Sequence, residues 1–313
     1  MVRESTAGTV IGENLALLAE ESTSADERKL AWLRDLAMLM LRRDSSIFGE
    51  TRSDDFSALF ESTPMPEDIP EDFLHHARFR NRAALFSDKL TVCRFLAEEL
   101  ERRGVKLLER LLGDDSYKSS PKIAYFKNAY ADAAFRIFSD VLDTPSVVYA
   151  PDFTAVCEEV YYGRADMCML PLDSSRDAKL ISFYRLIDKY ELNPVFSCDV
   201  TTPDGSVTTR YALLKRAIAL PDKTKRSGCF FEFSLVPDDG ATLGDVLSAA
   251  AECGLTLYKV DSIPLTYNSS EFSCEVILKV GDAPGLDAFV LFLTLAMPQY
   301  EPLGIYPHIR QGE

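Results

Sequence analysis

Hydrophobic positions in the first third of the chain recur with helical spacing. Residues 24–27, Ser-Ala-Asp-Glu, have the spacing of a capping box, and one apolar face follows them at 3.6 residues per turn: Leu30, Leu33, Ala37, Met40 and Leu41. A second helical pattern begins at Pro70 and continues to Gly104. Turn-forming residues over 113–120 then predict a linker. We therefore predict a helical region over residues 1–115.

The pattern changes after Pro121. Short apolar runs predict strands at 122–126, 146–150 and 167–170, and helical spacing between them predicts helices over 131–142 and 153–162. The run at 167–170 is apolar at every position, as in a parallel strand that is buried on both faces. Strands that alternate with helices predict an α/β layer architecture for residues 121–220.

The last part of the chain has a different order of elements. We predict strands at 230–236, 255–263, 271–280 and near Leu303, with helices over 242–253 and 285–296. Along 271–280 the apolar residues alternate with Ser273, Glu275 and Lys279, which is the period of a strand with one polar face. The order βαββαβ over residues 225–309 is ferredoxin-like. The whole chain is thus predicted to be a multidomain α/β and α+β protein.

Composition excludes several classes of function. The 313 residues carry a formal charge of −15 without a basic run, so we expect no nucleic-acid partner. No stretch approaches the roughly 18 apolar residues of a membrane span, and we expect a soluble, cytoplasmic protein with no membrane partner. The seven cysteines are widely spaced and form no Cys-x-x-Cys pair, which is typical of small buried side chains. His75, His76 and His308 lack the spacing of a metal site, and no cofactor motif is present, so we expect no metal or cofactor.

Several segments, in order, resemble the prephenate dehydratases that end in an ACT domain. The segments are Ile123–Tyr125, Phe153–Pro171 with Gly163, Ala165 and Asp166, Pro171–Ser175, Thr209–Tyr211, Lys259–Pro264 and Leu303–Pro307. The resemblance runs from about 122 to 309. It implies a bilobal α/β domain like that of periplasmic binding proteins, a ferredoxin-like ACT domain that binds an amino-acid effector, and a homodimer or higher homo-oligomer. The family reaction converts prephenate to phenylpyruvate with loss of water and carbon dioxide.

The resemblance also implies site residues. Thr209, Arg210 and Ser175 would be catalytic, and Lys127, Asp173, Ser174 and Tyr211 would contact the substrate. The motifs are eroded, because the family's Gly-Pro-x-Gly-Thr loop is missing over 126–132, and Ser174 and Val207 each replace an Asn. Purely structural interpretations remain open: Lys127 as a solvated side chain, residues 173–175 as a helix cap, and 207–211 as an ordinary strand.

The ACT-like part also departs from the family's motifs. The resemblance places the effector contacts at Ala241, Thr242 and Leu243 and at Asp261 and Ser262. Ile263 stands where the family has Arg, and Thr256 where it has Asn. An amino-acid effector would lose partners, whereas dimerisation through sheet edges would not depend on those side chains.

Two functions follow from these observations. In the first, the chain is a binding or regulatory relative of the dehydratases that holds a small, prephenate-like carboxylate and has absent or weak activity. In the alternative, it is a divergent but active dehydratase, which an N-terminal chorismate mutase would make bifunctional. The Arg and Lys pattern of that mutase is not evident in residues 24–112.

Overall fold

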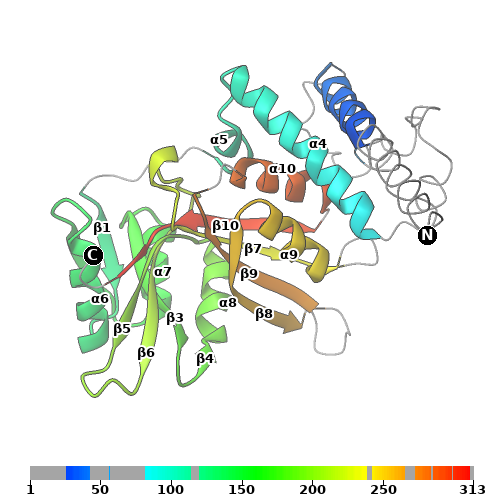
Figure 1. Ribbon diagram of the computed structural model, residues 1–313. Coiled ribbons are helices and arrows are strands. Elements are labelled where there is room, and N and C mark those ends of the chain that lie inside the picture. Colours follow the sequence, from blue (N-terminus) through cyan, green and yellow to red (C-terminus); the bar gives the residue numbers. More distant parts are fainter. Residues whose placement is uncertain are drawn as a thin grey trace, which may run out of the picture. The chain divides into compact units, whose positions relative to one another are not determined.

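A computed structural model describes residues 26–42, 56, 82–113, 120–237, 242–264, 272–282, 285–297 and 299–310 (Figure 1). The chain forms two compact units. One unit comprises residues 1–104 and 291–298, and the other comprises 105–290 and 299–313.

The first unit contains two of the predicted helices. Residues 26–42 are helical, and α4 spans Arg82–Arg102. The predicted start at Pro70 and the histidines 75 and 76 lie outside the described residues. An ion pair of 2.6 Å joins Lys29 Nζ to Asp88 Oδ1, and further along both helices the Arg34 guanidinium lies over the Phe95 ring. The residue numbers increase along both helices from the first contact to the second, so the two helices run in the same direction here.

In the second unit, a seven-stranded sheet has the order β11-β5-β6-β3-β1-β2, with β4 paired to β3. Its elements are α5 (Leu107–Leu112), β1 (Lys122–Tyr125), α6 (Ala129–Ser139), β2 (Ser146–Tyr149), α7 (Phe153–Tyr161), β3 (Met167–Ser174), β4 (Ala178–Lys179), α8 (Ile181–Tyr190), β5 (Asn193–Thr201), β6 (Thr208–Lys215) and β11 (His308–Ile309). Strands β1, β2 and β3 are parallel, while β6 is antiparallel to both β3 and β5. The mixed α/β class predicted from the sequence is confirmed.

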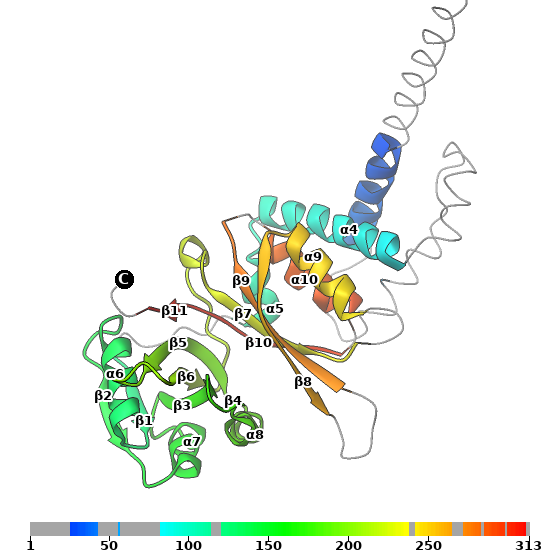
Figure 2. The ribbon, with the colours of Figure 1, turned by 60° about the horizontal axis from the view of Figure 1, so that its bottom comes forward.

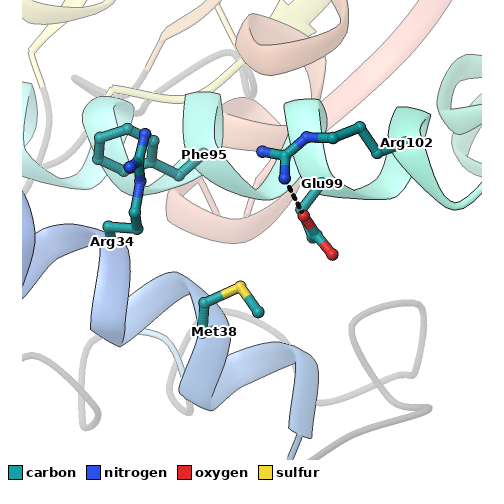
Figure 3. A pocket seen from close by; sticks show the side chains of 5 residues that line it. All are labelled: Arg34, Met38, Phe95, Glu99 and Arg102. Carbon is teal, nitrogen blue, oxygen red and sulfur yellow. Dashed lines mark ion pairs between the residues drawn. The ribbon is translucent and has the colours of Figure 1, made fainter.

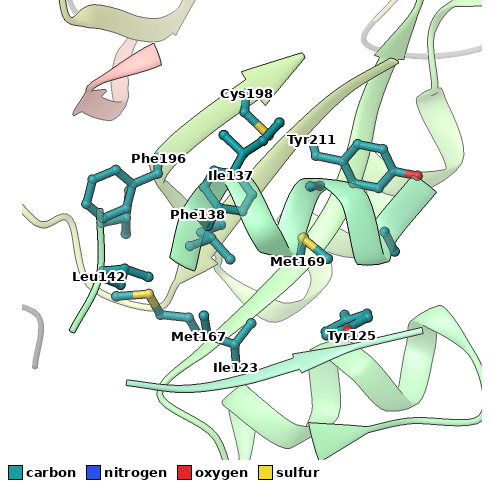
Figure 4. Packing of buried hydrophobic residues seen from close by; sticks show 14 of the residues in the cluster. Ile123, Tyr125, Ile137, Phe138, Leu142, Met167, Met169, Phe196, Cys198 and Tyr211 are labelled. Atoms are coloured by element: carbon teal, nitrogen blue, oxygen red, sulfur yellow. The ribbon is translucent and has the colours of Figure 1, made fainter. Parts of the chain in front are cut away.

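The two faces of this sheet carry separate apolar cores. On one face, Ile123, Met169 and Tyr211 pack with Ile137 and Phe138 of α6 (Figure 4). Side chains from α7 and α8 pack on the other face, against alternate residues of the same strands. All seven cysteines are buried, as predicted.

One sheet occupies the region for which the resemblance implied two lobes. After β3 the chain returns through β4 and α8 and re-enters the same sheet as the β5–β6 hairpin. The connection from 175 to 192 holds only these two short elements. Over the described residues, the strands between 122 and 215 therefore form one sheet rather than two separate lobes.

The second sheet has four strands in the order β10-β7-β9-β8 (Figure 2). The elements of this part of the chain, after the short 3₁₀ helix η2 (Lys223–Lys225), are β7 (Phe230–Leu235), α9 (Leu243–Glu252), β8 (Leu255–Pro264), β9 (Phe272–Val280), α10 (Leu286–Ala296) and β10 (Tyr300–Tyr306). Residues 291–296 of α10 belong to the first unit. The predicted βαββαβ order is thus confirmed. Strand β8 is an edge strand.

The end of the chain joins the two sheets of this unit. After β10 leaves the second sheet, β11 pairs in parallel with β5 of the first. Gly304 permits the crossing, because a Cβ atom there would lie 2.9 Å from the carbonyl oxygen of Pro194. His308 then bonds through Nδ1 to Ser197 Oγ at 2.9 Å and stacks on Phe230, so it is a packing residue.

Candidate functional site

Thr209 and Arg210 lie near the start of β6, and strand geometry directs their side chains to opposite faces of the sheet. Tyr211 packs in the core beneath α6, and Thr209, two residues earlier, shares that face. Arg210 instead reaches Tyr184 of α8, with Nη2 3.3 Å from the Tyr184 hydroxyl. The two residues predicted to act together therefore do not converge on one substrate position.

The Arg210 side chain is buried, with 4% of it exposed. Its Nη2 atom forms an ion pair with Asp173 Oδ2, while Nε and Nη1 have no hydrogen-bond partner within the described part of the chain. Burial lowers the pKa of this guanidinium, but Tyr306 and Glu232, with Tyr184 and Asp173, outweigh that effect and raise the pKa overall. Arg210 is therefore a permanent positive charge inside the protein.

Asp173 also reaches the second sheet. Its Oδ1 atom lies 2.6 Å from Lys259 Nζ on β8, and Lys259 in turn lies 2.9 Å from Asp261 Oδ2. The predicted substrate contact Asp173 and the predicted effector contact Asp261 are thus joined through one lysine. One residue from each predicted set, Arg210, Asp173 and Asp261, is thus joined through Lys259 in one chain of ion pairs, Arg210–Asp173–Lys259–Asp261.

A second ion pair crosses between the same sheets. Lys179 on β4 pairs with Glu275 on β9, and Lys179 Nζ also lies 3.7 Å from the centroid of the Tyr184 ring. Close by, the Tyr306 hydroxyl donates to Glu232. We call the charged members the cross-sheet ion network: Asp173, Lys179, Arg210, Glu232, Lys259, Asp261 and Glu275.

The network includes residues that sequence reasoning missed. Lys179, Glu232, Lys259 and Glu275 were not predicted as site residues, and Glu275 was assigned to the polar face of its strand. A signal was present, because Glu232 stands between phenylalanines in Phe230-Phe-Glu-Phe and is 2% exposed. A single charge within a buried strand requires a partner.

The other predicted substrate contacts lie near the carboxyl ends of β1, β2 and β3. Lys127 follows β1 and is exposed, with Nζ 4.8 Å from the centroid of the Tyr149 ring. Ser174 and Thr209 are partners in the β3–β6 ladder. Because β1, β2 and β3 are parallel, these positions share one edge of the sheet.

Chain-internal bonds occupy the polar groups at this edge. Asn128 caps α6, and its Oδ1 accepts from the backbone N–H groups of Tyr130 and Ala131 at 3.0 and 2.9 Å. Ser175 Oγ accepts from Thr208 N at 2.9 Å, and Ser174 Oγ accepts from the backbone N–H of Arg176. An anion at the α6 N-terminus would have to displace the Asn128 side chain.

Tyr211 is a core residue. It is 6% exposed, and burial raises the pKa of its hydroxyl to about 12, so it remains a phenol at neutral pH. Its ring lies beside Met169 under α6 (Figure 4).

Two of the predicted effector residues, Thr242 and Leu243, serve local structure. Thr242 caps α9 in a capping box with Asp245, directly before Leu243, the first residue of that helix. Ser262 is exposed on the edge strand β8. Ala241 lies outside the described residues.

A cavity of about 350 Å³ lies elsewhere in the same part of the chain. Its lining residues come from the second half of α9, the start of β8 and β9: Leu247, Ala250, Ala251, Gly254, Leu255, Thr256, Leu257 and Leu278. Among the described residues of this lining, Thr256 alone has a polar side chain. Asp261 and Ser262 are not among the lining residues, because they lie further along β8.

Over the residues that the structure describes, no group of three or more acidic, His or Cys side chains could hold a metal ion. Within the same residues, no helix has both the length and the apolar character needed to cross a membrane.

No protein-family model matches the chain, and no curated protein matches it. Several solved structures are similar to about three-fifths of it. The acylase GqqA, described as a novel type of quorum-quenching acylase, is 22% identical over 59% of this chain and 94% of its own, with a TM-score of 0.48. Prephenate dehydratase from Streptococcus mutans is 19% identical over 60% of this chain and 99% of its own, with a TM-score of 0.48. Prephenate dehydratase from Arthrobacter aurescens, solved in complex with L-Phe, is 13% identical over 59% of this chain and 90% of its own, with a TM-score of 0.45.

Proposed function

We propose that this chain is a non-catalytic relative of the prephenate dehydratases that binds a small carboxylate. The family assignment rests on the ordered motifs from Ile123 to Pro307. The observation that carries the loss of activity is the position of Arg210, which is buried against Asp173 on the face opposite to Thr209. A guanidinium held there cannot stabilise negative charge that develops beside the Thr209 hydroxyl.

The capped end of α6 supports the same conclusion. Dehydration of prephenate requires donors aimed at the substrate carboxylates and at the departing hydroxide. The Asn128 side chain occupies the N–H groups of Tyr130 and Ala131, which an anion would otherwise use. Lys127 is an exposed cation at this edge, and we place the bound carboxylate beside it and Tyr149.

The β8 edge supports a homodimer. Leu257 and Tyr258 on this edge strand are about half exposed, at 47% and 49%. An unpaired strand edge with exposed apolar side chains is suited to pairing with a second copy. An amino-acid effector would bind in this ACT-like part, where Thr256 lines an apolar cavity.

The active dehydratase remains the second candidate. Thr209 and Ser174 lie side by side in the β3–β6 ladder, which leaves two hydroxyl-bearing side chains at the carboxyl edge. In this reading Thr209 would assist the departing hydroxide, without the charge of Arg210.

The test is phenylpyruvate formation from prephenate by the purified chain, with an authentic prephenate dehydratase as the positive control. We expect no formation above the spontaneous rate, and no difference between the wild type and Thr209→Ala. Turnover that disappears in a folded Thr209→Ala variant would establish the active dehydratase instead. Calorimetric titration with phenylpyruvate then tests binding, which Lys127→Ala is expected to weaken by at least fivefold.

A further inference from the structure

The helical unit contains a cavity that the proposed function does not use. Its volume is about 290 Å³, and it lies between residues 26–42 and α4. Five side chains line it: Arg34, Met38, Phe95, Glu99 and Arg102 (Figure 3). Cavities of about this size are at the lower end of those that hold small molecules, which limits the occupant to a compact ligand.

The charges around this cavity are unequal. Arg102 Nη1 lies 2.6 Å from Glu99 Oε2, while Arg103 Nε lies 3.0 Å from Glu99 Oε1, so one carboxylate is shared by two guanidinium groups. Arg34 has no carboxylate partner among the described residues. Asp35 follows it in sequence but points about 100° around the helix. The cavity is therefore cationic in a protein whose formal charge is −15.

The Arg34 guanidinium is held in place by an aromatic ring. Its Cζ atom lies over the ring of Phe95, 4.8 Å from the centroid, and Figure 3 shows the two side chains beside each other. A guanidinium that stacks through its flat face keeps its N–H donors at the edge, where they can hold a carboxylate. Stacking thus reduces the conformational freedom that an exposed arginine loses when it binds.

The remaining lining is apolar and adaptable. Met38 lies between the two arginines in Figure 3, and its thioether, with the free part of the Phe95 ring, can contact a flat hydrocarbon body. A hydrophilic anion such as phosphate would leave these groups without contacts.

We propose that this cavity binds a small aromatic monocarboxylate, with its carboxylate on Arg34 and its ring against Met38 and Phe95. Arg102 adds positive charge on the other side, although Glu99 neutralises part of it. The site goes beyond the proposed function, since none of its residues belongs to the part of the chain that resembles the dehydratases.

The test is calorimetric titration of the full chain with phenylacetate. Benzylamine serves as the probe of equal size and opposite charge, and inorganic phosphate as the anion without a ring. We expect saturable binding of phenylacetate and at least tenfold weaker binding of both other probes. Arg34→Ala should raise the Kd for phenylacetate at least fivefold, and Arg102→Ala should raise it less.

Arg136→Ala, an arginine on α6, is the matched control and should leave the Kd unchanged. Circular dichroism confirms the fold of each variant. Equal binding of phenylacetate and benzylamine, no binding of phenylacetate, or an unchanged Kd in Arg34→Ala would each overturn the proposal. A signal lost in Lys127→Ala but kept in Arg34→Ala would assign the ligand to the α/β sheet, which overturns this site and supports the proposed function.

Discussion

Thr209 and Arg210 are adjacent in sequence but lie on opposite faces of strand β6. Arg210 contacts Asp173 and Tyr184 on the face that carries α8, whereas Thr209 shares the α6 face with Tyr211. The Thr209–Arg210 pair therefore contributes one residue to the carboxyl edge of the sheet and one to an interior ion network. The arginine thus has a structural role in the interior of the protein.

The first prediction concerns Arg210→Met. The substitution removes the charge of a side chain that is only 4% exposed. Glu232 and Asp173 then lose the positive charge that they interact with. Loss of one partner from a buried pair typically costs about 3 kcal/mol or more in the free energy of unfolding. We expect urea denaturation to show a decrease of about 3 kcal/mol or more in the free energy of unfolding.

Arg216→Met is the matched control, since Arg216 pairs with Glu191 at 2.8 Å but is 48% exposed. Exposed pairs contribute little, and we expect a change below about 1 kcal/mol. Equal effects of the two substitutions would contradict the assignment of Arg210 to the interior network.

Local sequence patterns were sufficient for most of the elements but not for the partners of Arg210. The alternation around 271–280 predicted strand β9, and the apolar run at 167–170 predicted the buried part of β3. Strand alternation could also have separated Thr209 from Arg210, had the motif not been interpreted as a unit. Burial of Glu275 could not be predicted, because it depends on Lys179, which lies 96 residues away.

A second prediction concerns the coupling of Lys259 to Asp173. Both side chains are mostly buried, at 26% and 15% exposed, and their 2.6 Å contact joins the two sheets. In a double-mutant cycle with Lys259→Met and Asp173→Asn, we expect a coupling energy of about 1 kcal/mol in the free energy of unfolding. Additive effects would show that this contact does not stabilise the junction.

A third prediction concerns the cap of helix α6. Asn128→Ala removes the acceptor for two backbone N–H groups, and we expect it to lower the free energy of unfolding by about 1 kcal/mol. Asn128→Gly should lower the free energy of unfolding by only a few tenths of a kcal/mol, because glycine leaves the two backbone N–H groups accessible to water. A glycine variant as unstable as the alanine variant would contradict this account of the cap.

A fourth prediction concerns the pH dependence of stability. Burial raises the pKa of Glu275 to about 7, although Lys179 opposes the shift, whereas the ordinary value is 4.5. Between these two values the folded state holds a proton that the unfolded state has released. The free energy of unfolding must therefore fall as the pH rises from about 5 to 7, and the contribution is fully present only below that window.

Glu275→Gln isolates this contribution, since the amide cannot titrate but still offers an oxygen to Lys179. The comparison is needed because a chain with a formal charge of −15 has other acidic groups that repel one another as the pH rises. We expect urea denaturation at pH 5, 6, 7 and 8 to show a decline that is steeper in the wild type than in the variant, by about 1 kcal/mol or more over the window. Parallel curves for the two proteins would mean that Glu275 has the same pKa in the folded and the unfolded chain. The placement of Glu275 in the interior between the sheets would then be incorrect.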